Sequence, residues 1–148
     1  MKPDELYQYA VSLLARKDYS HGEMRWVLSD ISDDNATVEH VIARLRDSNY
    51  LNDRRIAENI LSRLIQKHYG PLRLRQELRQ KGIAQDVTEQ VLNDCDVDWL
   101  QMAAQCRIKK FGELLPSEPK EKARQMRFLQ SHGFTMEMII DAITPSQD

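Results

Sequence analysis

The side chains that could do chemistry form no known catalytic motif. The four histidines stand at positions 21, 40, 68 and 132, and they share no metal-ligand spacing such as i, i+4. The sequences HExxH, GxSxG, GxGxxG and GxxxxGKS/T are absent. No nucleophile with its base can be placed in one cleft from the sequence. These absences favour a protein that is not an enzyme and that needs no cofactor.

Three aspartates at alternate positions are the nearest approach to a metal site. Asp94, Asp96 and Asp98 resemble the start of a calcium-binding loop. Such a loop needs glycine at its sixth place and an acid at its twelfth, where this chain has Trp99 and Gln105. We therefore interpret the acids as a helix end followed by a helix cap, and predict no metal site.

Basic side chains carry the remaining chemical signal. The formal net charge is −2, but residues 54–81 hold eight basic and two acidic side chains, a local charge of +6. Residues 82–98 then hold five acids and no base. A second basic stretch runs from Arg107 to Lys110 and from Lys120 to Arg127. Such segregation indicates a surface that faces phosphates or acidic groups, although a solvated face of amphipathic helices is the plain alternative.

The elements that would position these residues are helices. Apolar residues recur with a period near 3.6 along almost the whole chain, and Ser20 with Glu23 forms a capping box. Pro71 suits the first position of a helix, and Gly82 suits a left-handed C-cap. Gly22 lies inside a capped first turn, so it is expected to tolerate alanine. Most aromatic side chains lie beside apolar stripes, which favours core packing over base stacking.

The helical pattern repeats. At an offset of fifty residues, Tyr19, Met24 and Leu28 fall on Tyr69, Leu74 and Leu78, and at fifty-one Gly82-Ile83 falls on Gly133-Phe134. The last copy contains a nine-residue insertion around Glu113–Glu121. The sequence therefore predicts an all-α protein, with three tandem three-helix repeats in an elongated, curved array. We expect one domain over residues 1–148, with repeats at about 4–50, 51–96 and 97–144.

Composition agrees with a cytoplasmic protein. The chain has 148 residues, 41% hydrophobic residues and a mean hydropathy of −0.60. Only five glycines and five prolines are present, which disfavours an all-β sandwich. No apolar run approaches the roughly 18 residues of a membrane span, and no secretory signal is expected. Cys95 and Cys106 lack a partner motif and are predicted to be buried thiols in a reducing compartment.

Two segments carry a family resemblance. The sequences NYLNDRRIA at residues 49–57 and HYGPLRLRQELRQKGI at residues 68–83 resemble the signature segments of the bacterial RecX family. The sequences DVDW at 96–99, KKFG at 109–112 and RFLQSHGF at 127–134 are also similar to its proteobacterial members. The likeness covers about residues 7 to 143.

The resemblance implies a function that composition cannot supply. RecX proteins bind the filament of the recombinase RecA on DNA and inhibit its ATPase and strand exchange, which modulates recombination, DNA repair and the SOS response. It implies that this chain is an inhibitor without catalysis of its own. We expect a monomer, and the net charge of −2 favours RecA as the main contact, with DNA contacted secondarily. The residues expected to meet the RecA filament or DNA are Arg54, Arg55, Arg63, Lys67, Arg73, Arg75, Arg79, Lys81, Arg107, Lys109, Lys110, Lys122, Arg124 and Arg127.

Two other functions stay open at the level of sequence. A stand-alone nucleic-acid-binding module would use the same basic face on free DNA, with an affinity that falls steeply with salt. A hydrolase or nuclease would use Asp53, Glu58 or Asp96, with metal-dependent turnover that one carboxylate substitution abolishes.

Overall fold

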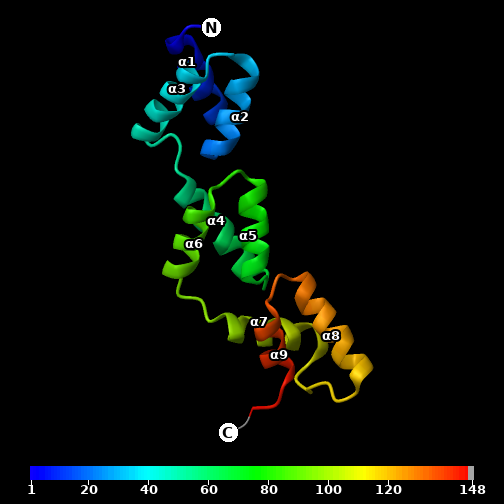
Figure 1. Cartoon of the computed structure of the whole chain (residues 1–148). Coiled ribbons are helices and arrows are strands. Elements are labelled where there is room, and N and C mark those ends of the chain that lie inside the picture. The colour runs from blue at the N-terminus through cyan, green and yellow to red at the C-terminus, as the bar shows by residue number, and fades with distance from the viewer. Residues whose placement is uncertain (147–148) are drawn as a thin grey trace. The chain divides into compact units, whose positions relative to one another are not determined.

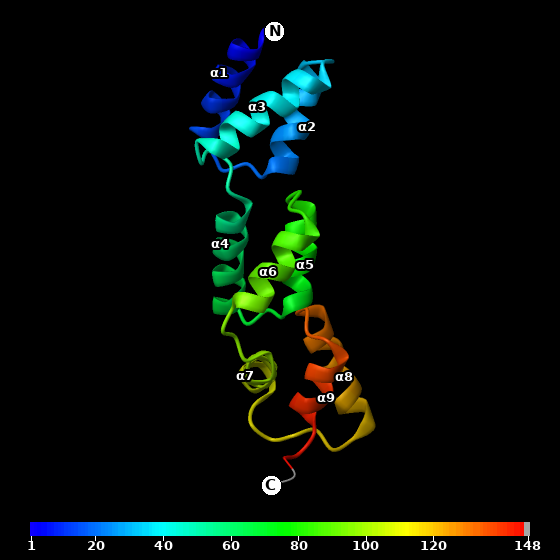
Figure 2. The ribbon, with the colours of Figure 1, turned by 60° about the vertical axis from the view of Figure 1, so that its left-hand side comes forward.

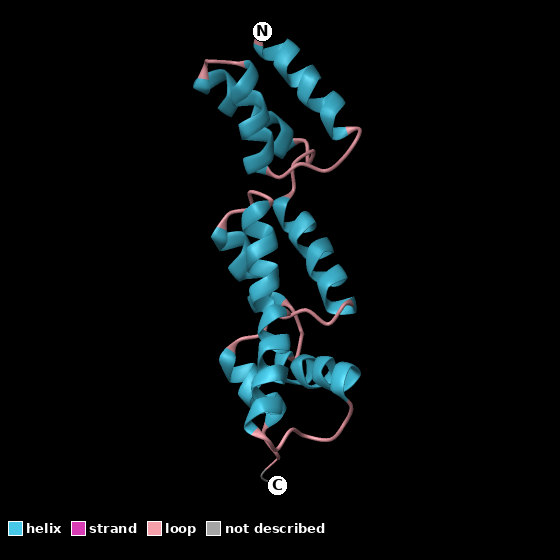
Figure 3. Ribbon diagram, turned by 90° about the vertical axis from the view of Figure 1, so that its right-hand side faces the viewer, coloured by secondary structure: helices cyan, strands magenta, loops and turns pink. Residues whose placement is uncertain are grey.

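The chain folds into α-helices. The computed structural model describes residues 1–146, which contain nine helices and no strand (Figures 1 and 3). The predicted all-α class and its nine helices are confirmed. The helices are α1 (Pro3–Leu14), α2 (His21–Ile31), α3 (Asn35–Asp47), α4 (Asp53–Gln66), α5 (Pro71–Gln80), α6 (Gln85–Asp94), α7 (Trp99–Phe111), α8 (Pro119–Ser131) and α9 (Met136–Ile143).

The helices divide between two compact units. The first unit contains Met1–Glu58 and Leu78–Val91, and the second contains Asn59–Glu77 with the chain from Leu92 onward. Helices α4 and α5 therefore contribute residues to both units. None of the helices in the described part of the chain is long and apolar enough to cross a membrane.

The first unit is built around α1, α2 and α3. Helix α3 packs against both α1 and α2 (Figure 1). The core lies between them because one apolar face of each helix is buried there. Its buried members are Leu6, Ala10, Met24, Leu28, Val38, Val41, Ile42, Leu45 and Leu51.

The second unit is built around α7, α8 and α9, with α9 in contact with the other two helices (Figure 2). Its buried apolar side chains are Ala103, Cys106, Leu129, Phe134, Ile139, Ala142 and Ile143. Local caps begin two of these helices. Asp98 accepts a hydrogen bond from the Gln101 N–H at 3.1 Å, and Thr135 accepts one from the Met138 N–H.

A glycine contact fixes the start of α2 in the first unit. The predicted capping box is present, and Ser20 Oγ also donates a hydrogen bond to the Lys81 carbonyl at 2.6 Å. Gly82 has the expected positive φ, +81°, and its backbone lies against Gly22. A Cβ atom on Gly22 would overlap the Gly82 carbonyl. The expectation that Gly22 tolerates alanine is therefore wrong, because another segment of backbone occupies the space.

An equivalent contact joins α5 to the end of α8 in the second unit. The Gly70 N–H donates to the His132 carbonyl at 2.7 Å, and the Leu72 N–H donates to the Gly133 carbonyl at 2.9 Å. Gly133 has a φ of +87°, and a Cβ atom on Gly70 would overlap its carbonyl oxygen. Each of these contacts thus pairs a glycine of positive φ with a glycine at the start of another helix.

Replacing Gly22 with alanine tests the first contact. Alanine normally stabilises a helix by about 0.5–1 kcal/mol over glycine. Here we expect Gly22→Ala to lower the free energy of unfolding by about 1–3 kcal/mol, as overpacking against fixed backbone does. The exposed Ser29 on the same helix serves as the control, and Ser29→Ala is expected to be nearly neutral. Urea denaturation measures both, and a more stable Gly22→Ala protein would contradict the contact.

Candidate partner-binding surface

In the first unit, the predicted basic residues are mostly paired with acids. Arg54 Nε lies 2.7 Å from Glu58 Oε1, and Lys81 Nζ lies 3.0 Å from Glu23 Oε1. Arg55 lies 3.8 Å from the carboxylate of Asp18. Arg79 is exposed and forms no ion pair with any residue in the described range. Its guanidinium is therefore available to a partner.

In the second unit, one carboxylate holds two of the predicted arginines. Glu77 accepts hydrogen bonds from Arg63 and from Arg73, whose guanidinium also lies over the ring of Tyr69. Burial of the Glu77 carboxyl acts to raise its pKa. The hydrogen bonds and the positive charges of the two arginines together outweigh that effect and hold the pKa of Glu77 below its ordinary value of 4.5. Arg63 and Arg73 are thus partly neutralised, and Arg75 is half-buried.

Arg107 is not on the surface. Its side chain is only 2% exposed, and its guanidinium donates hydrogen bonds to the carbonyls of Gly112, Glu113 and Leu114 at 3.2–3.3 Å. These carbonyls belong to the loop that leaves α7, where the insertion begins. The prediction that Arg107 meets a partner is therefore corrected: it braces this loop.

The remaining predicted cations lie on α7, α8 and the end of α4. Arg124 is 2.8 Å from Glu121 across one turn of α8. Five others are exposed and have no ion pair within residues 1–146, namely Lys67, Lys109, Lys110, Lys122 and Arg127. Free positive charge in the second unit is therefore carried mainly by lysines.

Three of these lysines share one hollow. It has a volume of about 290 Å³ and lies at the end of α4 against α7 and α8. Its lining residues are Lys67, His68, Cys106, Lys109, Lys110, Phe128 and His132. Sequence reasoning placed the lysines on a basic surface but missed the two histidines and Phe128. The available signal was that His68 precedes Tyr69 and His132 precedes Gly133, two residues that the repeat alignment matches.

Stacked rings fix one wall of this hollow. The ring of His132 stacks on Tyr69 with centroids 5.0 Å apart and lies 4.2 Å from the ring of Phe128. His132 Nδ1 is 3.1 Å from the Phe128 carbonyl, which can only accept a hydrogen bond. Burial raises the pKa of the Cys106 thiol to about 11. That thiol is therefore uncharged at neutral pH.

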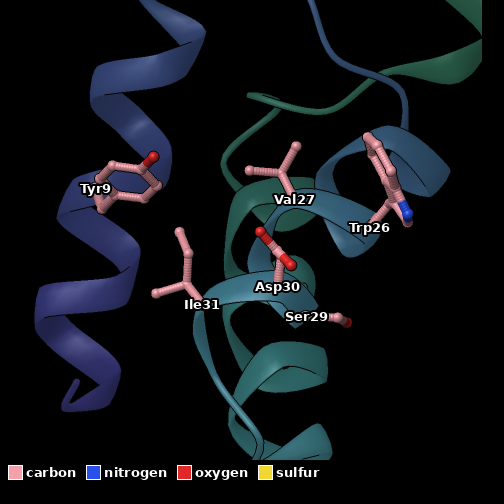
Figure 4. Close-up of a pocket in the computed structure, with 6 residues that line it drawn as sticks. All are labelled: Tyr9, Trp26, Val27, Ser29, Asp30 and Ile31. Atoms are coloured by element: carbon pink, nitrogen blue, oxygen red, sulfur yellow. The ribbon is translucent and has the colours of Figure 1, made fainter.

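A second hollow, of about 450 Å³, lies on the first unit. Its lining residues are Tyr9 on α1 and Trp26, Val27, Ser29, Asp30 and Ile31 on α2. Tyr9 and Ile31 face each other across it, and Trp26 stands on its far side (Figure 4). Trp26 is 79% exposed, so it is not among the aromatic residues that pack in the core.

The described residues show no arrangement for metal chemistry. No group of three or more His, Cys, Asp or Glu side chains within residues 1–146 could hold a metal ion. Helix α6 ends at Asp94 and Asp98 caps α7, as predicted for these acids. Both cysteines are free thiols, and Cys106 is buried whereas Cys95 is half-buried.

Comparison with known proteins identifies the family. The model of the second three-helix domain of RecX matches residues 52–92, and that of the third matches residues 96–143. The regulatory protein RecX of Salmonella arizonae is 38% identical, in an alignment that covers 90% of this chain and 87% of the relative. The chain belongs to the RecX family. The RecX protein of Salmonella typhimurium gives the same identity and coverage.

Solved RecX structures share the fold. The crystal structure of RecX from Lactobacillus salivarius has a TM-score of 0.79 at 18% identity, and the match covers 95% of this chain and 94% of that one. A second crystal structure of a regulatory protein RecX has a TM-score of 0.74 at 20% identity, covering 95% of this chain and 70% of that chain. These similarities support an all-α repeat fold of the RecX type.

Glu77→Gln tests the pairing of two arginines with one carboxylate. A carboxyl whose folded pKa is lowered stabilises the fold above its unfolded pKa, and this contribution is lost as pH falls through the folded pKa. We expect a loss of about 0.5–1 kcal/mol at neutral pH, since solvent screens the half-exposed arginines. The difference from the native protein should shrink as pH falls below 4.5. Glu113→Gln is the control, and an equal, pH-independent loss in both variants would argue against the pairing.

Arg107→Met tests the brace on the loop after α7. It keeps much of the apolar stem but removes the guanidinium from three carbonyls, so a loss of about 1–3 kcal/mol is expected. Arg127→Met on the exposed face of α8 should change stability by less than about 0.5 kcal/mol. Thermal or urea denaturation compares the two, and similar values would mean that the Arg107 hydrogen bonds contribute little.

Proposed function

We propose that this RecX-family protein binds the DNA-bound filament of the recombinase RecA and inhibits the ATPase and strand-exchange activities of RecA. The observation that carries the proposal is family membership, together with the signature segments at residues 49–57 and 68–83. In this proposal the protein is a monomeric cytoplasmic inhibitor that acts by occupancy rather than by catalysis, and it thereby modulates recombination, DNA repair and the SOS response.

We also propose that residues 1–148 form one helical-repeat domain, with the repeats at about 4–50, 51–96 and 97–144. In such a domain each repeat buries an apolar face of its neighbour. The glycine contacts at Gly22 and Gly70 support this organisation, since each joins helices that belong to successive repeats.

The residues assigned to filament binding are the predicted cations of each unit without Arg107. Those with the strongest support are exposed and lack an ion pair, because their charge is not offset within the described chain. They are Lys67, Arg79, Lys109, Lys110, Lys122 and Arg127. The paired residues Arg54, Arg55, Arg63, Arg73, Lys81 and Arg124 and the half-buried Arg75 are assigned to the same set with weaker support, because their charge is partly offset or less exposed.

Inhibition of RecA is tested with its ATPase on single-stranded DNA. Titration with the native protein should suppress the rate, and an unchanged rate at several-fold excess over RecA would refute the proposed function. The charge reversals Arg79→Glu, Lys122→Glu and Arg127→Glu, combined in one variant, should weaken suppression strongly while leaving the fold intact, since these side chains are exposed and unpaired.

The matched control reverses three acids of the first repeat. Glu5, Asp30 and Asp33 are exposed, and changing all three to lysine alters charge by the same amount. Asp34 is left unchanged because it caps α3 by accepting hydrogen bonds from Ala36 and Thr37. If the acidic variant loses inhibition while the basic variant keeps it, the surface has been assigned to the wrong face.

A further inference from the structure

The hollow at the end of α4 concentrates positive charge that the described chain does not neutralise. Lys67 directly follows α4, and Lys109 and Lys110 lie in the last turn of α7. No acidic side chain lines the hollow, and none of the three ammonium groups forms an ion pair within residues 1–146. The Cys106 thiol beneath them is uncharged. An ordinary solvated face intersperses acids with bases, and this hollow does not.

His68 gives a second, independent observation. Its φ of +62° makes it the left-handed cap that ends α4, with the Tyr69 N–H donating a hydrogen bond to the Leu64 carbonyl at 3.0 Å. Its Nδ1 atom is shielded from solvent and has no hydrogen-bond partner among the described residues. Buried polar atoms of this kind usually have a partner, and a bound ligand is one way to supply it.

The donor set of the hollow suits a phosphate group. The cationic lining groups are lysines, and the guanidinium of Arg107, which follows Cys106 in sequence, is directed to its loop carbonyls. Ammonium groups act as point charges with three donors each, which suits the several oxygens of a phosphate.

We propose that this hollow binds a phosphate group of a single-stranded nucleic acid, with Lys67, Lys109 and Lys110 as its cationic ligands and the imidazoles of His68 and His132 beside them. The inference rests on the proposed function, because it names the part of the chain that would contact DNA in the filament. Phe128 and the stacked His132 ring form an aromatic wall against which the adjoining nucleotide lies.

The test measures binding of the full chain to a fluorescent thymidine oligonucleotide at low and rising salt. Neutralising the hollow with Lys67→Gln, Lys109→Gln and Lys110→Gln should weaken binding several-fold. It should also flatten the slope of log affinity against log salt by about 0.7 for each phosphate that the variant no longer neutralises. The control variant, with Lys2→Gln, Arg16→Gln and Lys17→Gln, removes the same charge elsewhere and should keep the native slope. Equal effects in both variants, or no binding by the native protein at low salt, would overturn the proposal.

The four histidines provide a readout that does not depend on variants. On addition of the oligonucleotide, the imidazole resonances of His68 and His132 should shift in NMR spectra, and those of His21 and His40 should not. The opposite pattern, or no shift in any, would also overturn the proposal. Thymidine monophosphate as competitor separates the two sources of phosphate. Displacement of the strand by an equimolar amount would mean that the hollow selects a free nucleotide, and the strand proposal would fail.

The RecA ATPase assay separates this inference from the proposed function. If the native protein inhibits RecA but the hollow does not engage the oligonucleotide, the phosphate site fails and the proposed function stands. If the oligonucleotide binds in the hollow but RecA is not inhibited, the proposed function fails and the phosphate site stands.

Discussion

Close contact between two glycine backbones is the constraint on which the helical arrangement within each unit depends. Gly82 lies against Gly22 in the first unit, and Gly133 lies against Gly70 in the second. A positive φ at Gly82 and Gly133 lets the chain turn out of a helix, and the missing Cβ on the opposite glycine lets that turn approach a helix start. The hydrogen bonds that Ser20 and Gly70 donate there satisfy carbonyl groups at helix ends. Glycine suits both positions of the contact, since it adopts a positive φ readily on one side and lacks a Cβ atom on the other.

Arginines and lysines have different electrostatic roles in this chain. Several arginines serve the fold: Arg63 and Arg73 share Glu77, and Arg107 holds three loop carbonyls. A guanidinium suits this because its planar donors can bind several acceptors at once. The cations left without an acid in the second unit are mostly lysines. Counting charges along residues 54–81 therefore overstates the free charge there, since Asp18 and Glu23 from the first repeat neutralise part of it.

Features that depend on neighbours in sequence could be predicted, and features that depend on distant residues could not. The capping box at Ser20, the positive φ of Gly82 and the cap at Asp98 follow from a few adjacent residues, and all are present. The space beside Gly22 is occupied by Gly82, sixty positions further along the chain. The residues around Gly22 in the sequence therefore do not reveal that alanine has no room there. The burial of Arg107 likewise depends on how the loop after α7 folds back. The lysines of the hollow were predicted as part of a basic surface. That they lie beside His68 and His132 depends on tertiary packing, which the sequence does not show.

The same glycine contact that packs the second unit also shapes the lysine-lined hollow. Gly70 donates its N–H to the carbonyl of His132, and the ring of that histidine stacks on Tyr69 and lies against Phe128. His68 lies two residues before Gly70 and has a left-handed backbone conformation. The position of its imidazole therefore depends on the turn that places Gly70. Any substitution that separates Gly70 from Gly133 must therefore move both histidines as well as weaken packing. The contact that stabilises the unit thus also sets the geometry of the hollow, and the two properties cannot vary independently.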